Sequence, residues 1–292
     1  MNSSIIIRWF IIFFLIITGC APKTAPVETE PEVIIEAPTP TEVPMAACVN
    51  GDGIPLADYE AEIKRYQDAL NQLGEQLDPE AIKTDVLDEM IKQLLLVQGA
   101  YQSGFSVSDA DVQAKYNELA SELGSEDALR TWIFENHYDD QTFRRALTQE
   151  LAAIWMRNQI IASVPLTAEQ VHARQIQVND ENLAVSIERQ LQVGSDFESL
   201  ARQYDPQTGG DLGWFPRGYL LQPDIENAAF SLNPGEYSPI IRTSYGYHIV
   251  YVVEKDDQHP LSPDGLAFMR RNAVQNWLTE KQEQSTIEVI TP

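Results

Sequence analysis

The chain has 292 residues, of which 43% are hydrophobic, so it is long enough to form two modest domains that each bury a core. Its net charge of −24 excludes a protein that binds nucleic acid by neutralising phosphates. Four scattered histidines, His137, His172, His248 and His259, predict neither a metal site nor a cofactor, because no zinc-ligand spacing or nucleotide-binding glycine pattern accompanies them.

An almost uninterrupted apolar run extends from Ile5 to Ile17. It is short for a membrane span but has the length of a signal-peptide core. The sequence Ile17 to Cys20 resembles a bacterial lipobox, which predicts a lipoprotein signal peptide over residues 1–20 and lipidation of Cys20. The alternative is an uncleaved N-terminal anchor with an incidental cysteine. Cys48 is then expected to be a small buried apolar residue rather than half of a disulfide.

Residues 21–47 are predicted to form a disordered tether. The stretch from Ala21 to Pro44 contains six prolines and five glutamates. Such a segment cannot bury enough apolar surface to offset the entropy of ordering, and its like charges repel one another. It would hold the folded part of the protein away from the membrane.

Residues 48–166 are predicted to form a helical domain. The sequence from Val49 to Ile54 indicates a short strand and a turn, and a first helix follows from Tyr59. A second helix begins after Pro79 and ends near Gly104. The apolar residues expected to face inward recur at helical spacing and are Ile63, Tyr66, Leu70, Leu73 and Leu77 in the first helix and Ile82, Val86, Met90, Leu94 and Tyr101 in the second.

Three further helices are predicted in this domain. Ser108 and Asp111 resemble a capping box that would begin the third helix. A fourth helix surrounds Leu129 to Ile133, and a fifth runs from near Asp140 to Asn158. None of these helices carries paired carboxylates or paired histidines, so we expect the chemistry in the other half of the chain.

Residues 167–257 are predicted to form a second domain, after a boundary from Ala162 to Glu169. Its first strand runs from Ala173 to Asn179, a helix capped by Asp180 reaches Val193, and another helix carries Phe197 to Tyr204.

The rest of this domain is organised around glycines and turns. The glycine-rich stretch from Gly209 to Gly213 predicts a tight loop that leads into a short strand. A helix follows from Pro223 to Phe230, and Asn233 to Gly235 forms a turn. The β-branched and aromatic runs Tyr237 to Arg242 and Gly246 to Glu254 predict a hairpin, with His248 near the start of its second arm.

Four short motifs follow one another in the second domain. They are a Gly-Gly-Asp-Leu-Gly-aromatic loop at Gly209 to Phe215, Ala-Ala-Phe at Ala228 to Phe230, Pro-Gly-Glu at Pro234 to Glu236 and Gly-aromatic-His at Gly246 to His248. In this order they resemble the parvulin family of peptidyl-prolyl isomerases. The resemblance implies a four-stranded, mainly antiparallel sheet with flanking helices, and isomerisation of X-Pro peptide bonds.

The segment from Ala47 to Ile161 resembles the helical N-terminal domain of SurA/PrsA-like extracytoplasmic foldases, down to the Val-Asn-Gly sequence at Val49. This resemblance implies a chaperone domain that holds unfolded clients. It also implies that residues 258–292, with a helix from Leu261 to Glu283 and a strand from Ile287 to Ile290, pack back on that domain. The predicted fold class is therefore α+β, with a helical chaperone domain and a parvulin-like domain.

A parvulin site lowers the torsional barrier of a prolyl bond, about 20 kcal/mol, without breaking a bond and without a cofactor. It requires an apolar slot for the proline ring and polar groups around the amide. The resemblance implies that the substrate is bound by Leu212, Leu220, Leu221, Ile225, Phe230 and Tyr245. It implies that the catalytic residues, expected as one polar cluster behind the slot, are Gln175, Asp205, Thr243 and His248.

Gln175 departs from the family pattern, which has a histidine on the first strand. A glutamine side chain donates and accepts hydrogen bonds without titrating, so the polar cluster can persist in altered form, or isomerase activity can be weak or absent. His172 cannot replace the family histidine, because an odd shift along a strand places a side chain on the opposite face of the sheet.

These features predict a peptidyl-prolyl isomerase in the bacterial cell envelope, lipid-anchored through Cys20 on the outer face of the cytoplasmic membrane or on the periplasmic side of a membrane. Its partners would be unfolded or partly folded exported proteins with X-Pro bonds. The alternative is a holdase chaperone whose parvulin domain binds without catalysing. A remote alternative is a solute-binding lipoprotein, which would alternate strands and helices throughout.

Overall fold

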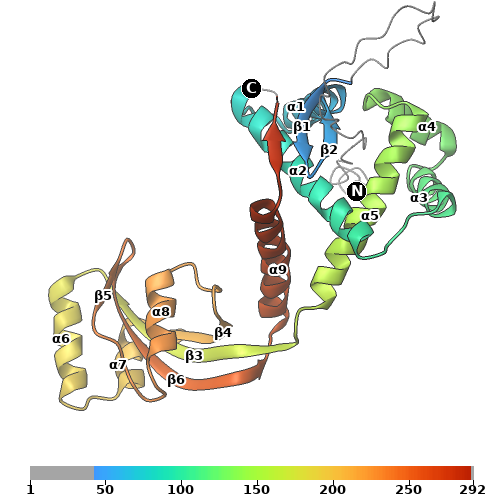
Figure 1. The fold of residues 1–292 in the computed structure, drawn as a ribbon. Coiled ribbons are helices and arrows are strands. Elements are labelled where there is room, and N and C mark those ends of the chain that lie inside the picture. Colours follow the sequence, from blue (N-terminus) through green and yellow to red (C-terminus); the bar gives the residue numbers. More distant parts are fainter. Residues whose placement is uncertain (1–42, 291–292) are drawn as a thin grey trace, which may run out of the picture. The chain divides into compact units, whose positions relative to one another are not determined.

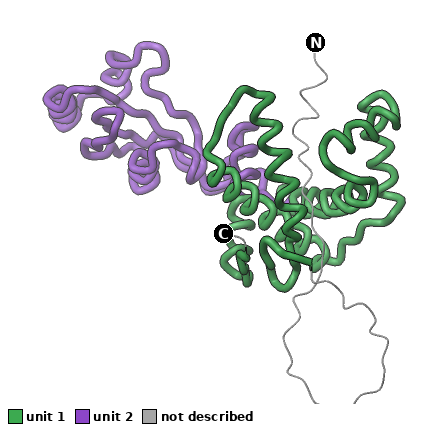
Figure 2. Tube along the Cα trace, turned by 90° about the horizontal axis from the view of Figure 1, so that it is seen from above, with its two compact units in different colours: residues 1–161, 274–292 green, residues 162–273 purple. Residues whose placement is uncertain are grey.

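The computed structural model describes residues 43–290, and Figure 1 shows their fold. The predicted signal peptide, Cys20 and the predicted tether up to residue 42 lie outside the described residues. The described chain divides into two compact units, which are coloured separately in Figure 2. One comprises the residues up to Ile161 and those from Val274 onward, and the other comprises Ala162–Ala273.

The first unit contains a small antiparallel sheet with the strand order β2-β1-β7. β1 (Met45–Val49) and β2 (Asp52–Pro55) form a hairpin. Its turn consists of Asn50 and Gly51, whose φ angles of 54° and 91° are typical of a tight two-residue connection. β7 (Ile287–Val289), from the far end of the chain, pairs with the other edge of β1.

The first strand begins earlier than the sequence predicts. Residues 45–47 were expected at the end of the tether, whereas they belong to β1, and Ala46 and Ala47 have no exposed area. Small side chains beside prolines and glutamates carry little local strand signal. Pairing with two neighbouring strands satisfies the backbone of this segment, and only the fold supplies those partners.

The helices that precede the second unit are α1 (Leu56–Leu73), α2 (Pro79–Gln102), α3 (Asp109–Glu122), α4 (Glu126–Glu135) and α5 (Asp140–Ala162). The predicted capping box of α3 is confirmed, since the Ser108 hydroxyl accepts a hydrogen bond from the Asp111 N–H at 3.2 Å and the Asp111 carboxylate accepts one from the Ser108 N–H at 3.0 Å. α2 is buried on all sides near its middle, where Leu94 to Val97 are consecutive buried residues. It is therefore the central helix of this unit.

Three residues that were expected to face inward are exposed. Leu73, Leu77 and Tyr101 have exposed fractions of 59%, 47% and 39%. α1 ends at Leu73, Leu77 lies in the connection between α1 and α2, and Tyr101 lies in the last turn of α2. Helical periodicity identifies an apolar face but not the point at which the helix stops burying it. The buried side of α1 instead includes Glu62, whose carboxylate accepts a hydrogen bond from Arg65 Nε at 2.8 Å.

The second unit is built on a four-stranded antiparallel sheet with the order β4-β3-β6-β5. Its strands are β3 (Thr167–Val178), β4 (Asp211–Pro216), β5 (Ile241–Thr243) and β6 (Gly246–Pro260). Its helices are α6 (Glu181–Gln192), α7 (Phe197–Tyr204) and α8 (Pro223–Ser231), and α9 (Pro263–Gln284) begins in this unit. The predicted α+β fold class, with a helical region and a four-stranded antiparallel sheet, is confirmed.

Two hydrophobic clusters lie on opposite faces of this sheet. α6 and α7 cover the face that carries Ile176 and Ile249. α8 covers the other face, where Phe215, Val250 and Val252 are buried. Because side chains alternate along a strand, Ile249 and Val250 of β6 are directed towards different clusters.

The two central strands are longer than the sequence predicts. β3 was expected to begin at Ala173 but begins at Thr167, and β6 continues past Glu254 to Pro260. The extra residues pair with each other, from Thr167 opposite Pro260 inward. The buried Gln170 supports this pairing, because its Nε2 donates to the backbone carbonyl of His259 at 2.8 Å. Thr167 to Glu169, expected as part of the domain boundary, are therefore strand.

Among residues 43–290, no helix combines the length and the apolar character that are needed to cross a membrane.

Candidate active site

A chain of hydrogen bonds joins three side chains on the face of the sheet that α8 covers. His248, from β6, has no exposed area. Its Nδ1 lies 3.0 Å from Oε1 of Gln175 on β3, and its Nε2 lies 2.9 Å from Oγ1 of Thr243 on β5. The Thr243 hydroxyl also accepts a hydrogen bond from the backbone N–H of Tyr245 at 3.0 Å. We call Gln175, His248 and Thr243 the polar chain.

The partners of His248 define its protonation. Oε1 of Gln175 can only accept, so Nδ1 of His248 carries the proton. Nε2 then accepts the hydrogen bond that the Thr243 hydroxyl donates, while the same hydroxyl oxygen accepts from Tyr245. Burial lowers the pKa of His248, because desolvation disfavours the charged imidazolium. The ring is therefore neutral at pH 7, and the polar chain carries no net charge.

The side-chain NH₂ group of Gln175 is available as a hydrogen-bond donor. Its Oε1 is occupied by His248, and no residue in the described part of the chain accepts a hydrogen bond from its Nε2. The Gln175 side chain is only half-buried, so this NH₂ group can donate to an external acceptor. The polar chain thus presents an amide donor at its accessible end.

Asp205 does not join the polar chain, which corrects the expectation of a single cluster. Its carboxylate accepts hydrogen bonds from the backbone N–H groups of Gln207 and Thr208, each at 3.1 Å, and of Gly210 at 3.2 Å. It also accepts from the Thr208 hydroxyl, and these bonds lower the pKa of Asp205. The ionised carboxylate therefore holds the loop at residues 207–210, a role that Asp and Thr at this spacing commonly have in turns.

This loop is locked against β3. The Gly210 carbonyl accepts a hydrogen bond from the Gln175 N–H at 2.8 Å. A Cβ atom on Gly210 would lie 1.9 Å from the Gln175 carbonyl oxygen, so no residue other than glycine fits. Asp205 thus affects the site indirectly. It holds Gly210 against the backbone of Gln175, whose side chain is hydrogen-bonded to His248.

Leu212 and Leu220 pack against the buried cluster of this face, to which Ile225 belongs. Leu212 and Leu220 are half-buried, whereas Ile225 is 1% exposed. We call these three residues the slot. Ile241 also packs here, and it lies directly opposite His248 in the pairing of β5 with β6. The sequence alone did not identify Ile241, because its place against this cluster depends on that strand pairing.

Three other residues expected to contact the substrate lie elsewhere. Leu221 is 99% exposed and points away from the cluster that Leu220 joins, and Tyr245 is 63% exposed in the turn between β5 and β6. Phe230 is buried beneath the slot, where its ring meets Phe215 edge-on at a centroid distance of 6.0 Å. Consecutive residues in a loop diverge in direction, so sequence alone could not choose between Leu220 and Leu221.

His172 lies apart from the polar chain, as expected from strand alternation. Its Nε2 lies 2.8 Å from Oδ1 of Asp211, the aspartate of the glycine-rich loop. Asp211 Oδ1 also accepts from the Gly213 N–H at 2.8 Å. This pair holds the loop beside Leu212 from the opposite side of the sheet.

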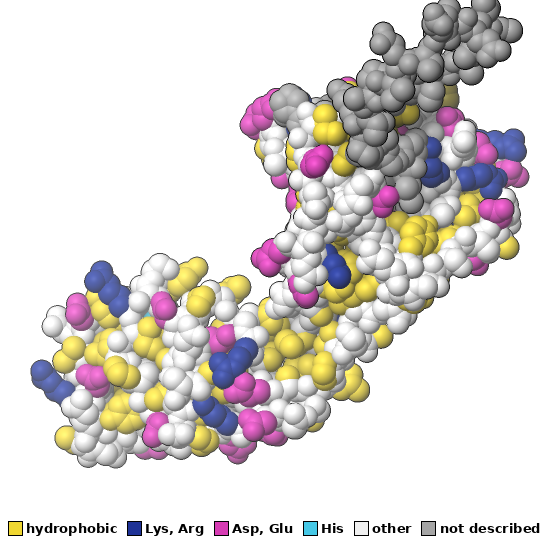
Figure 3. Space-filling view, in the orientation of Figure 1, with side chains coloured by type: hydrophobic (Ala, Val, Ile, Leu, Met, Phe, Trp, Pro, Cys, Tyr) yellow, Lys and Arg dark blue, Asp and Glu magenta, His cyan; other side chains and the backbone are white. Residues whose placement is uncertain are grey.

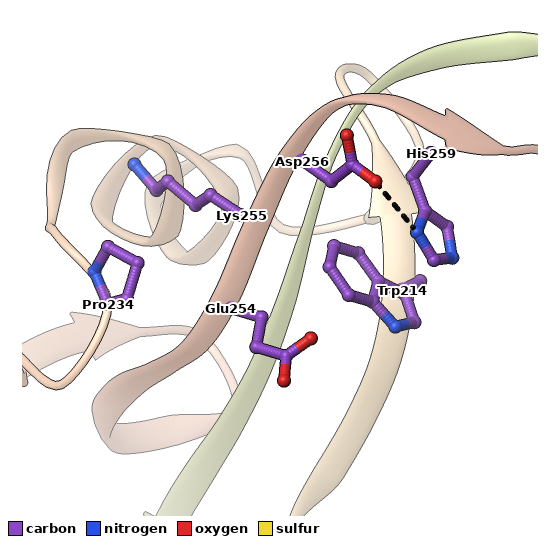
Figure 4. Close-up of a pocket in the computed structure, with 6 residues that line it drawn as sticks. All are labelled: Trp214, Pro234, Glu254, Lys255, Asp256 and His259. Atoms are coloured by element: carbon purple, nitrogen blue, oxygen red, sulfur yellow. Dashed lines mark ion pairs between the residues drawn. The ribbon is translucent and has the colours of Figure 1, made fainter.

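A separate pocket of about 520 Å³ is lined by Trp214, Pro234, Glu254, Lys255, Asp256 and His259, and Figure 4 shows these side chains. His259 stacks on Trp214 with a centroid distance of 3.8 Å, and its Nδ1 pairs with Asp256 at 3.5 Å. Lys255 Nζ donates to the Phe230 carbonyl at 2.6 Å. None of the residues of the polar chain or the slot lines this pocket, so it is not the place of the predicted chemistry.

No group of His, Cys, Asp and Glu within residues 43–290 is arranged to hold a metal ion. On the face shown in Figure 3, basic side chains are interspersed with acidic ones rather than gathered in a single patch. The candidate site therefore consists of the polar chain and the slot.

Two family models match the sequence. A PPIC-type peptidyl-prolyl isomerase domain matches residues 166–254, which include the polar chain and the slot, and a SurA-like N-terminal domain matches residues 3–157.

Several curated relatives are named foldase protein PrsA. The foldase protein PrsA of Caldanaerobacter subterraneus is 31% identical over 234 residues, which are 70% of this chain and 72% of that protein. The foldase protein PrsA of Bacillus subtilis is 27% identical over 282 residues, 88% of this chain and 90% of that protein. Among solved structures, the peptidylprolyl isomerase PrsA of Bacillus anthracis matches with 27% identity and a TM-score of 0.41, over 68% of this chain and 96% of that one.

Proposed function

The chain belongs to the PrsA family of foldases, and on that premise we propose that it isomerises X-Pro peptide bonds in exported, unfolded proteins outside the cytoplasm. One observation carries the proposal. A neutral, buried His248 is hydrogen-bonded on both sides, to Thr243 and Gln175, on the sheet face that also carries the slot. This is an apolar surface next to oriented hydrogen-bonding groups, which is the combination that a prolyl bond requires.

The geometry supports a mechanism by preferential binding of the twisted amide. The conjugation of a prolyl bond produces a barrier of about 20 kcal/mol, and rotation removes that conjugation. Leu212, Leu220 and Ile225 would hold the proline ring and exclude water from it. The Nε2 group of Gln175 would donate to the amide as it twists, and His248 would keep Gln175 oriented. Catalysis follows if these contacts are stronger with the twisted form than with either planar form.

An isomerase assay on a proline-containing tetrapeptide tests the proposal. The wild type should accelerate isomerisation, and Leu212→Ala should lower kcat/KM about ten- to hundredfold, because losing one leucine's apolar contacts costs about 1–3 kcal/mol. Val193→Ala is the matched control, since Val193 is 84% exposed and follows α6 in the same unit. If the wild type does not accelerate isomerisation beyond the uncatalysed rate, the proposed isomerase activity is refuted.

The replacement of the family histidine by Gln175 favours a second candidate, a holdase in which the parvulin-like unit only binds clients. We assign client holding to the helical unit in both candidates. Suppression of aggregation of an unfolded protein should therefore be unchanged in Leu212→Ala. If the wild type suppresses aggregation but has no isomerase activity, the holdase is the correct candidate.

Membrane attachment is the remaining part of the proposal. Cys20, outside the described residues, would carry the lipid after cleavage of the signal peptide, and residues 21–42 would then form a tether. Cys20→Ser should abolish incorporation of radioactive palmitate and leave an unprocessed or freely soluble protein, because it removes the one proposed site of acylation. Continued labelling of this variant would refute the anchor.

A further inference from the structure

The connection from β4 to α8 carries a residue of the slot but has little backbone structure of its own. It spans residues 217–222 and presents Leu220 to the apolar cluster while Leu221 is exposed. Among the described residues, its one backbone hydrogen bond within the turn joins the Tyr219 N–H to the Pro216 carbonyl at 3.3 Å. Something other than secondary structure must therefore hold Leu220 in place.

Glu226, on α8, holds this connection through both of its carboxylate oxygens. Oε1 accepts a hydrogen bond from the Gly218 N–H at 2.5 Å, and Oε2 accepts one from the Leu220 N–H at 2.9 Å. Glu226 is 9% exposed, so water competes little with these two bonds. Hydrogen bonds from backbone N–H groups to an ionised, buried carboxylate are stronger than those between neutral groups.

The ends of the connection have separate attachments. Arg217 forms a two-pronged ion pair with Glu169 on β3, at 2.8 and 3.0 Å, and its guanidinium lies 4.1 Å from the centre of the Phe230 ring. The ring of Tyr219 meets Phe268 of α9 edge-on at 5.2 Å. These contacts anchor side chains, whereas Glu226 is the one residue within 43–290 that accepts a hydrogen bond from the backbone N–H of the slot residue Leu220. Its bond therefore controls the direction in which Leu220 points.

We propose that Glu226 is a positioning residue for the isomerase: it fixes the 217–222 connection so that Leu220 closes the slot, and it thereby sets the affinity for the proline-containing substrate. The inference rests on the proposed function, because it concerns the same slot. Glu226 itself does not contact the substrate. It acts on Leu220 as Asp205 acts on Gly210, so that a carboxylate holds each of the two loops that form the site.

The test uses Glu226→Gln in the full chain, because an amide can accept one of the two hydrogen bonds but offers an N–H to the second donor. Amide hydrogen exchange at Gly218 and Leu220 should accelerate. The KM for a proline-containing peptide, measured by exchange NMR, should rise about tenfold or more, as expected for the loss of one hydrogen bond to a charged group, while kcat changes little. A variant that was merely less stable would lose active enzyme, which lowers the apparent kcat and leaves KM unchanged.

A double-mutant cycle with Leu220→Ala tests the route of the effect. If Glu226 acts through Leu220, the double variant should have nearly the KM of Leu220→Ala alone, so the two effects are not additive. Glu236→Gln is the matched control. It removes a carboxylate that accepts the Asn233 N–H at 2.8 Å in another turn of the same unit, and it should leave KM unchanged.

The outcomes separate this inference from the proposed function. Unchanged exchange at Gly218 and Leu220, additive effects with Leu220→Ala, or faster exchange without a change in KM would each overturn the role of Glu226. If the wild type binds the peptide but does not isomerise it, the proposed function fails, and the dissociation constant replaces KM as the readout for Glu226. A wild type that neither binds nor isomerises the peptide overturns both.

Discussion

Gln175 connects the buried end of the polar chain to its accessible end, because Oε1 accepts from His248 while Nε2 remains available. Gln175→Leu should lower isomerase kcat/KM about fivefold or more, since it removes the Nε2 donor for the twisted amide and leaves the His248 N–H without an acceptor, each at a cost of about 1–3 kcal/mol. Gln175→His should preserve or raise activity, because an imidazole can again accept that bond. A protease-coupled isomerase assay on the tetrapeptide compares the two variants. A fully active Gln175→Leu variant would contradict the proposed contribution of Gln175 to isomerisation.

His248 should make stability depend on pH. Burial lowers its pKa below the value of about 6.5 in an unfolded chain, so the unfolded state binds more protons between the two values. The stability that neutral His248 contributes is therefore complete above about pH 6.5 and is lost as the pH falls below it. Chemical denaturation from pH 8 to pH 5 should detect a decreasing difference between the unfolding free energies of wild type and His248→Gln.

Comparison with the variant is needed because other groups titrate in the same range. Burial raises the pKa of Asp58, in the helical unit, to about 6, which has the opposite effect on stability as the pH falls. Both proteins contain Asp58, so its contribution cancels in the difference. Parallel curves for the two proteins would contradict the assignment of His248 as a buried neutral group.

At the scale of elements, the glycine-rich loop is hydrogen-bonded to β3 through Gly210 and Gln175. Two glycines of the loop allow a matched test of how much this contact matters for activity. Gly210 and Gly213 have nearly equal φ angles of 68° and 67°, so alanine should cost about 1–2 kcal/mol of backbone strain at either position. A Cβ atom on Gly213 would meet nothing within 4 Å, whereas one on Gly210 would collide with the backbone of Gln175. Gly210→Ala should therefore lose isomerase activity far more than Gly213→Ala.

Thermal unfolding and the isomerase assay, applied to both glycine variants, measure this difference. The reason for it is positional, because only Gly210 touches the strand residue that bonds His248. Equal losses in the two variants would mean that backbone strain dominates and that the close approach of the loop to β3 has no separate importance.

At the scale of the whole molecule, the first unit is closed by residues from both ends of the described chain. Asn50 donates its N–H to the Thr286 carbonyl at 2.9 Å and accepts from the Thr286 N–H at 3.0 Å, and Ile290 N–H donates to Ala46 at 2.8 Å. Nearby, Trp277 of α9 packs so closely over Gly99 of α2 that a Cβ atom there would lie 2.8 Å from the ring.

Deleting residues 285–292 should destabilise the first unit without affecting the site. The deletion removes these three hydrogen bonds, the Asn50 side-chain bond to Ser285 and the pairing of β7 with β1, so at about 1 kcal/mol for each bond the unfolding free energy should fall by at least about 3 kcal/mol. Circular dichroism on denaturation measures it, together with faster labelling of the Cys48 thiol, which is buried in β1. Isomerase kcat/KM is the internal control and should be unchanged, because the deleted residues belong to the first unit.

The sequence by itself determined the types and order of the elements and the family resemblance. Helical spacing located α1 to α5, the Ser108 capping box marked the start of α3, and the Gly-aromatic-His motif placed His248 early in the last long strand. These are local properties, because helical periodicity, capping and turn chemistry involve residues only a few positions apart. The link between Asp205 and Thr208 is equally local, so its turn signal was available in the sequence.

Only the tertiary structure decided which side chains meet at the site. His248 bonds Gln175, 73 residues earlier in the chain, and the choice of Leu220 over Leu221 depends on how a short connection is held by Glu226 on the following helix. The pairing of β7 with β1 joins segments more than 230 residues apart. Such contacts leave no periodic signal in a single sequence, because strand register and loop direction follow from packing between distant segments rather than from the residues of either segment alone.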